Sequence, residues 1–180
     1  MINNIEQIVL SNLPYISYLN DNGDINDKLT GKIGLYAIFN YYKKLEYIGY
    51  SRNLLLSLKQ HLIRQPDKCY WLKYHVIERP SRSILEEIKQ KWLEENGSTP
   101  SGNGEDEGLW TQPIDTKTTM NDDDKQQYNS LDELGKIKLL KKVARRYEEI
   151  IKNQLDERGV KFEVRFNPKL KEDGLLDLKI

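Results

Sequence analysis

The alternation of apolar and polar residues between positions 32 and 96 predicts three strands. The run Ile33–Phe39 is apolar at almost every position, which is typical of a strand covered on both faces. Leu45–Tyr50 follows after the short polar connection Asn40–Lys44, so the two runs predict a hairpin. Tyr70–Glu78 is rich in aromatic and branched residues and predicts a third strand.

Two helices are predicted around this third strand. Asn53 is a good N-cap for a helix that runs to about Ile63. Its apolar residues recur at helical spacing and are Leu54, Leu55, Leu58 and Leu62. Ser83 and Glu86 form a capping-box pattern for a second helix, and Gly97 provides its end. The order β-β-α-β-α predicts an α+β fold with a small antiparallel sheet flanked by helices.

The C-terminal region predicts one more helix and one more strand. Ser130 and Glu133 again form a capping box, and Gly159 suits the helix end. Between them an apolar stripe recurs at helical spacing through Leu134, Ile137, Leu140, Val143, Tyr147, Ile150 and Ile151. Val160, Phe162, Val164 and Phe166 then alternate with polar residues, as in a half-buried strand. We expect this extension to dock on the first sheet, because such a stripe left exposed would promote aggregation.

Composition shifts divide the chain into four parts. We predict an N-terminal extension over 1–31, an ordered domain over 32–103, an acidic linker or loop over 104–129 and the helix–strand extension over 130–180. The acids of the third part are Glu105, Asp106, Glu107 and the run Asp122–Asp124.

The charge balance narrows the classes of protein. Lys plus Arg number 28 and Asp plus Glu number 28, so the net charge is zero, which argues against a strongly cationic DNA-coating protein but allows a local basic patch. The single cysteine, Cys69, forms no metal-ligand pattern with His61 and His75, so zinc is not expected and both histidines are interpreted as structural. With no apparent signal peptide or membrane span, a cytoplasmic protein without membrane contact is expected.

A pair of short motifs lies on the predicted hairpin. Gly34-Leu35-Tyr36 and Tyr47-Ile48-Gly49 are placed so that ten residues separate the two tyrosines. The second motif continues as YIGYSRN to Asn53, and Lys59-Gln60-His61 follows on the predicted helix. Over residues 32–103 the chain resembles the GIY-YIG endonuclease family, in particular the branch that includes the domain fused to plastid monothiol glutaredoxins.

This resemblance implies hydrolysis of DNA phosphodiester bonds with one divalent metal ion, Mg²⁺ or Mn²⁺. Tyr36 and Tyr47 take the positions of the family's tyrosines, which lie near the scissile phosphate, and Asn103 takes that of its asparagine. A base within hydrogen-bond reach must deprotonate the attacking water, and one tyrosine helps in this. The family's arginine offsets phosphate charge, and a glutamate holds the metal.

The chain departs from the family pattern at two charged positions. Serine stands at position 57, where the family has its arginine, so Arg52 at the start of the helix becomes the candidate guanidinium. The usual position of the metal-binding glutamate holds Lys91, and Glu87 and Glu95 lie one turn to either side as candidate ligands. Losing one preorganised charge from such a site lowers the rate by about 10²–10³.

A basic stripe on the C-terminal helix is a separate candidate for nucleic-acid contact. Four cations recur three and four residues apart and therefore share one helix face, namely Lys138, Lys141, Lys142 and Arg145. These cations have two interpretations. They contact nucleic-acid phosphates, or they form an ordinary solvated helix face whose charge the acidic linker neutralises. In the hairpin loop, Tyr41 and Tyr42 are candidates for stacking on bases.

Three functions follow from these patterns. The leading one is a metal-dependent endonuclease acting on DNA, with branched and single-stranded DNA among its candidate substrates. The second is a nucleic-acid-binding module that has kept the fold and lost the chemistry, as Ser57 and Lys91 favour. The third is a protein-interaction domain in which residues 130–180 dock a protein partner.

Overall fold

The computed structural model describes residues 8–79 and 81–180 and divides the chain into two compact units. The first unit is Met1–Thr111 and the second is Gln112–Ile180. The docking of the C-terminal extension on the sheet stays a prediction.

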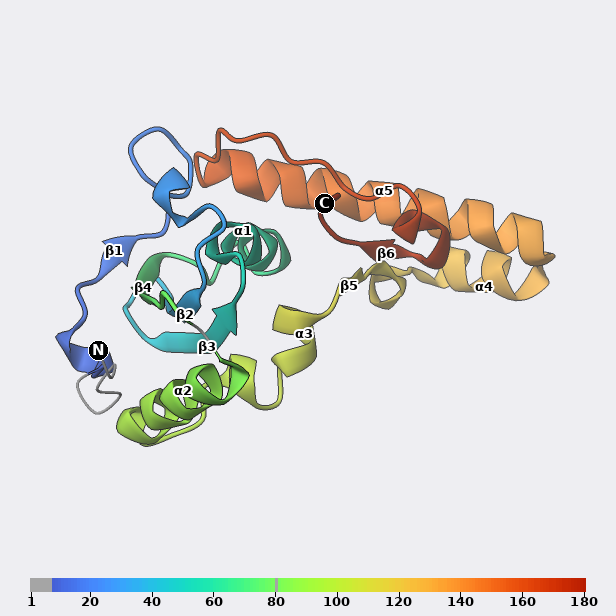
Figure 1. The fold of residues 1–180 in the computed structure, drawn as a ribbon. Coiled ribbons are helices and arrows are strands. Elements are labelled where there is room, and N and C mark those ends of the chain that lie inside the picture. Colours follow the sequence, from blue (N-terminus) through green and yellow to red (C-terminus); the bar gives the residue numbers. More distant parts are fainter. Residues whose placement is uncertain (1–7, 80) are drawn as a thin grey trace. The chain divides into compact units, whose positions relative to one another are not determined.

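The first unit is built on a four-stranded antiparallel sheet, which confirms the predicted α+β class (Figure 1). Its strand order is β1-β4-β2-β3, with bounds β1 Ile16–Ser17, β2 Gly34–Phe39, β3 Leu45–Ser51 and β4 Trp71–Val76. All three predicted strands are present, and each end lies within two residues of its predicted position. Strand β1 comes from the N-terminal extension, and its two residues are too few to show a period-two pattern.

Two helices cover opposite faces of this sheet (Figure 1). Leu35 and Ala37 of β2 belong to one apolar cluster with Trp92 of helix α2, Arg82–Asn96. Tyr36, between them, contacts His61 of helix α1, Leu54–Arg64. Because successive strand residues point to opposite faces, α1 and α2 lie on opposite sides of β2.

Most of the predicted helix ends are confirmed, but two N-caps are shifted. The Asn53 side chain accepts from Leu56 N at 3.3 Å, and Gly97 ends α2 with a φ of 78°. Ser81, not Ser83, caps α2, and Asp132 replaces the predicted Ser130 as the cap of α5. In both cases two good capping residues lie two positions apart, and the local pattern does not discriminate between them.

The segment predicted as an acidic linker or loop contains regular structure. It holds α3 Glu107–Thr111, β5 Ile114–Asp115 and α4 Asp122–Ser130. The run of aspartates lies in the first turn of α4, where negative charge is favourable, and Asn121 forms a capping box with Asp124. These helices lack the apolar periodicity by which the sequence reveals longer ones.

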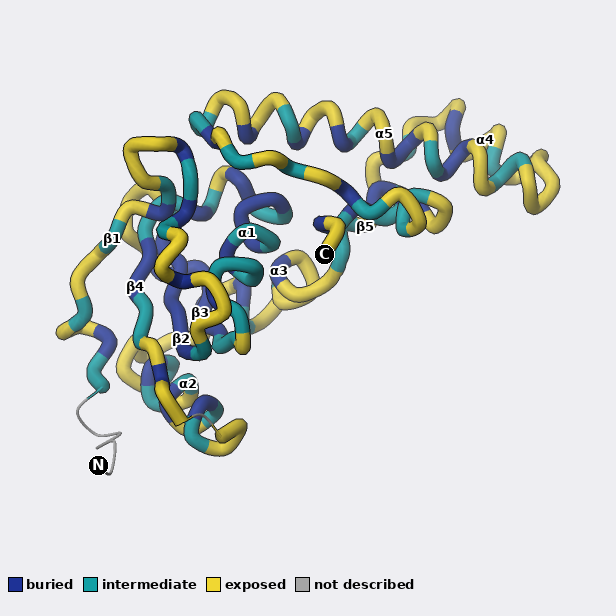
Figure 2. The backbone as a smooth tube through the Cα atoms, turned by 45° about the horizontal axis from the view of Figure 1, so that its top comes forward, coloured by how far each residue is buried: buried dark blue, intermediate teal, exposed yellow. Residues whose placement is uncertain are grey.

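The second unit is organised along α5, Glu133–Glu157, beside α4 and a two-stranded pair of β5 with β6, Leu175–Leu176. Figure 2 shows buried and exposed positions alternating along α5, as expected of an amphipathic helix. Its buried residues are Leu139, Leu140, Val143, Ala144, Glu148, Ile151 and Leu155. Of the predicted apolar stripe, Leu134 is 62% exposed and Ile137 is 36% exposed.

The strand predicted over Val160–Phe166 is absent. Only Phe166 forms an isolated bridge, with Leu178. The alternation does place Val160 and Phe166 in buried positions, but a strand also requires a neighbouring backbone along its length. Among the described residues, no helix is long and apolar enough to cross a membrane.

Candidate functional site

The two motif tyrosines lie together on the α1 face of the sheet. Tyr36 pairs in register with Gly49, and Tyr47 pairs two residues further along, so the rings are diagonal neighbours with centroids 6.0 Å apart. A Cβ at Gly49 would lie 2.7 Å from the Tyr36 hydroxyl and 2.7 Å from a carbon of the Tyr47 ring. Only glycine therefore allows both rings to occupy this surface.

His61, which the sequence predicted to be structural, completes this cluster. The Tyr36 hydroxyl lies 2.6 Å from His61 Nε2, and the imidazole centroid is 4.8 Å from that of Tyr47. Burial, followed by the nearby Arg64 charge, lowers the pKa of His61 to about 3. The imidazole is therefore neutral at pH 7, and its Nε2 shares a hydrogen bond with the Tyr36 hydroxyl. The Lys59-Gln60-His61 motif was the one feature of the sequence that pointed to a functional position for His61.

Trp110 of α3 closes the cluster from outside the sheet. Its ring is fully buried and stacks on Tyr47 with centroids 5.3 Å apart and planes 3° apart. Tyr36 is only 3% exposed and Tyr47 only 8% exposed. Burial raises the pKa of both tyrosines, that of Tyr36 strongly, so both hydroxyls stay protonated in this closed arrangement.

Arg64 supplies a positive charge beside the tyrosines despite the serine at position 57. It follows Ser57 by seven residues and His61 by three, so all three share one face of α1. The Arg64 charge lowers the pKa of both tyrosines, which opposes the larger effect of burial. Its Nη1 also donates to the Trp110 carbonyl oxygen at 2.8 Å.

Arg52, the predicted guanidinium, lies elsewhere. It is exposed and lines a cavity of about 680 Å³ together with Tyr50 and Arg82, and neither motif tyrosine lines that cavity. Strand alternation explains this placement, because Tyr50 points to the α2 face while Tyr47 points to the α1 face. The structure does not bring Arg52 to the tyrosines.

Asn103, the predicted catalytic asparagine, forms two hydrogen bonds with the outer edge of β3. Its Oδ1 accepts from Ile48 N at 2.8 Å, and its Nδ2 donates to Ile48 O at 2.8 Å. Both bonds go to backbone groups of the residue next to Tyr47, at the side of β3 that no strand covers. Asn103 therefore positions the strand that carries Tyr47.

The two predicted metal ligands lie on α2, on the other side of the sheet from the tyrosines. Glu95 accepts from the backbone nitrogens of Leu10 at 2.8 Å and Ser11 at 2.9 Å. Glu87 is exposed and forms an ion pair with Lys91 at 3.8 Å. Glu87 and Glu95 therefore do not fit a metal at the tyrosine cluster, and no group of three or more metal-ligating side chains occurs within residues 8–79 and 81–180.

Glu107 is the carboxylate whose charge acts on the tyrosine cluster. It lies on α3 and raises the pKa of Tyr47, after the larger effect of burial. Mg²⁺ commonly binds through one or two carboxylates, several waters and the phosphates of its substrate. The Glu107 side chain is exposed, and no group of three or more metal-ligating side chains surrounds it among the described residues.

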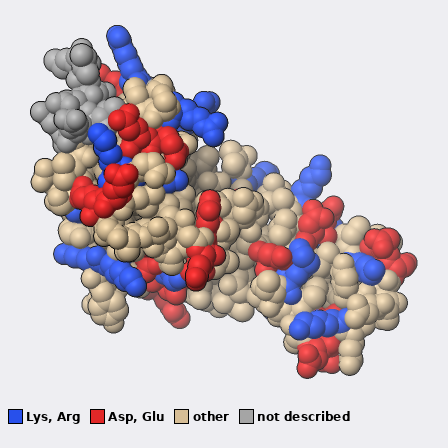
Figure 3. All heavy atoms as spheres, turned by 90° about the horizontal axis from the view of Figure 1, so that it is seen from below, with Lys and Arg blue, Asp and Glu red and all other residues tan. Residues whose placement is uncertain are grey.

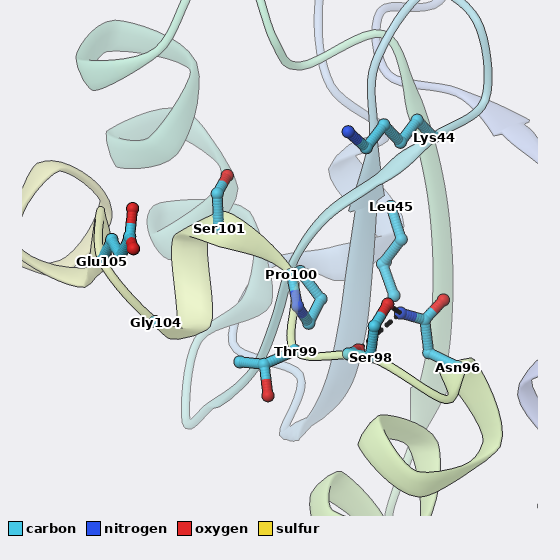
Figure 4. Close-up of a pocket in the computed structure, with 9 residues that line it drawn as sticks. All are labelled: Lys44, Leu45, Asn96, Ser98, Thr99, Pro100, Ser101, Gly104 and Glu105. Atoms are coloured by element: carbon cyan, nitrogen blue, oxygen red, sulfur yellow. Dashed lines mark hydrogen bonds between the residues drawn. The ribbon is translucent and has the colours of Figure 1, made fainter.

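A second cavity and the surface charges lie apart from the tyrosine cluster. A cavity of about 580 Å³ at the edge of β3 is lined by Lys44, Leu45 and the loop from Asn96 to Glu105, where Asn96 donates to Ser98 O at 2.7 Å (Figure 4). Neither motif tyrosine lines it. On the face seen in Figure 3, cations and anions are interspersed.

The predicted basic stripe on α5 is partly neutralised within its own unit. Lys141 pairs with Glu172 at 3.4 Å, whereas Lys138, Lys142 and Arg145 are exposed. The adjacent Arg146 binds Asp124 at 2.5 Å and holds the pKa of that carboxyl below its usual value. The acidic segment therefore pairs with Arg146, outside the predicted stripe, and three cations of the stripe are exposed.

Comparison with known proteins gives one partial similarity. The chain is 31% identical over 81 residues to the bifunctional monothiol glutaredoxin-S16 of Arabidopsis thaliana chloroplasts. The match covers 43% of this chain and 28% of that protein. No protein-family model matches the chain. A segment of this chain is thus similar to part of a chloroplast monothiol glutaredoxin.

Proposed function

We propose that the cluster of Tyr36, Tyr47, His61 and Arg64 hydrolyses phosphodiester bonds of DNA with Mg²⁺ or Mn²⁺, on a fold of the GIY-YIG type. The observation that carries this proposal is the convergence of two hydroxyls and a guanidinium on one face of the sheet. The motif spacing and the partial similarity to glutaredoxin-S16 support it.

Each residue has a role that follows from its chemistry. The Arg64 guanidinium matches the geometry of a phosphate and would offset the charge that develops there. Tyr47 would orient the attacking water and share its proton, and the Arg64 charge opposes the rise in the Tyr47 pKa that burial causes. The neutral His61 would hold the Tyr36 hydroxyl in place through their hydrogen bond. When bound, the metal ion would act as a Lewis acid on the phosphate.

Access to this site requires α3 to move. A phosphate cannot reach Tyr47 while Trp110 is stacked on its ring, so the arrangement described is a closed one. Opening would also hydrate the tyrosines and remove the burial that raises their pKa. Closure therefore suppresses the chemistry and opening favours it.

Nicking of supercoiled plasmid with Mg²⁺ or Mn²⁺ tests the proposal. Cleavage should disappear with a chelator and in Tyr47→Phe, which removes only the hydroxyl. Tyr50→Phe is the matched control, because Tyr50 lies on the same strand and points to the opposite face, and it should cleave normally. If the folded protein cleaves no better than Tyr47→Phe with either metal, on plasmid, branched and single-stranded DNA, the proposal is wrong.

The second candidate function is a nucleic-acid-binding module without cleavage. The burial of both tyrosines and the hydrogen bond of Ser57 to Ser51 Oγ at 2.6 Å, in place of a charge, favour it. In this case DNA would bind equally well in Tyr47→Phe. Replacement of Lys138, Lys142 and Arg145 by glutamine would flatten the salt dependence of that binding if these cations contact phosphates.

A further inference from the structure

The tip of the β2–β3 hairpin, Asn40–Lys44, presents two bare aromatic rings to solvent. Tyr41 is 66% exposed and Tyr42 is 84% exposed, although each has an apolar ring that burial would stabilise. Lys43 and Lys44 follow them directly. None of these side chains belongs to the cluster around Tyr47, and the hydrophobic core does not require them.

The backbone of this hairpin tip is tightly held. The Asn40 side-chain oxygen accepts from Tyr42 N at 2.9 Å and from Lys44 N at 3.1 Å. Lys43 N donates to Asn40 O at 2.9 Å, and Asn40 N donates to Lys44 O at 2.9 Å. Because these four bonds fix the loop in advance, little backbone entropy is lost when the rings bind a ligand.

Lys43 occupies a backbone position that favours glycine. Its φ of 62° lies in the left-handed region, where a β-carbon is unfavourable. Its ammonium nitrogen lies 4.9 Å from the centroid of the Tyr15 ring and 4.7 Å from that of Trp71. The side chain is thus retained at a conformational cost and holds its charge among aromatic rings.

Neighbouring aromatic side chains extend the exposed rings into a surface. Tyr41 makes edge-to-face contacts with Tyr42 at 5.3 Å and with Tyr70 at 5.5 Å between centroids. Tyr15, which is 41% exposed, makes a similar contact with Phe39 at 4.9 Å. The exposed rings and the Lys43 ammonium therefore lie together at this end of the sheet.

We propose that this surface binds single-stranded DNA, with bases stacked on Tyr41 and Tyr42 and phosphates beside Lys43 and Lys44. Exposed rings interspersed with cations match the alternation of base and phosphate along a single strand, whereas the paired bases of a duplex keep their faces covered. Lys44 directly precedes β3 and lies three residues before Tyr47, about 10 Å along the backbone at 3.3 Å per residue. A bound strand would thus start within a few nucleotides of the tyrosine cluster, although binding here does not depend on cleavage.

Fluorescence anisotropy of a labelled 20-nucleotide oligo-dT, titrated with the full chain in EDTA, tests this proposal. Tyr42→Ala should weaken binding about 5-fold or more, and Tyr42→Phe should stay within about twofold, because stacking needs the ring and not the hydroxyl. Lys44→Gln should weaken binding and reduce its salt dependence. Tyr128→Ala is the matched control, since Tyr128 also has a lysine, Lys136, above its ring and lies in the other unit.

Several results would overturn the proposal. These are the absence of oligo-dT binding by the unmodified chain, an unchanged affinity when Tyr41 and Tyr42 are both replaced by alanine, or stronger competition by duplex DNA of equal length. Circular dichroism of the variants excludes misfolding, which the exposure of Tyr42 makes unexpected. EDTA prevents metal-dependent cleavage, so the binding assay does not depend on nuclease activity. Failure of the nicking assay would therefore refute only the proposed cleavage, and failure of the binding assay would refute only the proposed binding of single-stranded DNA.

Discussion

Replacement of Asn103 tests whether this residue positions β3 or takes part in chemistry. Asn103→Leu removes both hydrogen bonds to the backbone of Ile48, while Asn103→Asp keeps the acceptor for Ile48 N and places a second oxygen against Ile48 O. The aspartate variant has nearly the same shape as asparagine. Any difference therefore comes from the loss of one donor and the gain of a charge.

The expected magnitudes follow from these two bonds. Each neutral hydrogen bond contributes about 1 kcal/mol, so Asn103→Leu should lose about 2 kcal/mol of unfolding free energy. Asn103→Asp should lose about 2–3 kcal/mol at pH 7.5, because one bond is lost and a carboxylate faces a carbonyl oxygen. When the introduced carboxyl is protonated it again donates to Ile48 O, so most of this loss should disappear at low pH.

The sign of the pH dependence can be worked out. The facing carbonyl raises the folded-state pKa of the introduced carboxyl above its unfolded value of about 3.9. Relative to the unmodified chain, stability should therefore fall as pH rises from about 3.9 through the folded-state pKa. Urea unfolding followed by tryptophan fluorescence at pH 7.5 and pH 4.0 measures this difference. If both variants are as stable as the unmodified chain at pH 7.5 and yet fail to nick plasmid, the positioning role is refuted and Asn103 acts in the chemistry.

Three further predictions concern buried groups. Trp110→Ala should lower unfolding free energy by about 3–5 kcal/mol in urea titrations, and Trp110→Phe should cost much less, since the buried indole nitrogen has no hydrogen-bond partner among the described residues. The pKa of His61 is about 3 when folded, below the ordinary 6.5. Stability should therefore fall by about 2 kcal/mol between pH 7.5 and 5.0, and His61→Gln should remove this slope. Asp124→Asn should cost about 1–3 kcal/mol at pH 7 through the bond to Arg146, measured by thermal unfolding. Arg146 lowers the pKa of Asp124, so the cost of this substitution should shrink as pH falls through the folded-state pKa of Asp124. Asp115→Asn is the control, because Asp115 belongs to an exposed ion pair and its replacement should change stability little.

Local patterns determined much of the first unit. The strands Gly34–Phe39 and Leu45–Ser51 and helix α1 were predictable because alternation and capping act between residues close in the chain. The meeting of Tyr36 and Tyr47 was predictable for the same reason, since a short hairpin fixes the register of its two strands. The conformation of the hairpin tip likewise depends on one nearby residue, Asn40.

Only the tertiary structure decided which distant residues join the tyrosines. Arg64 was hidden because helix periodicity shows which residues share a face but not what that face meets. Trp110 lies in a five-residue helix, too short to have a period, and Glu87 and Glu95 were separated from the tyrosines by the sheet itself. The spacing of two residues along the chain predicts whether they are close in space only when both lie in one helix, one strand or one turn. The composition of the site depended on which helix covers which face, and that choice is made by packing across the whole unit.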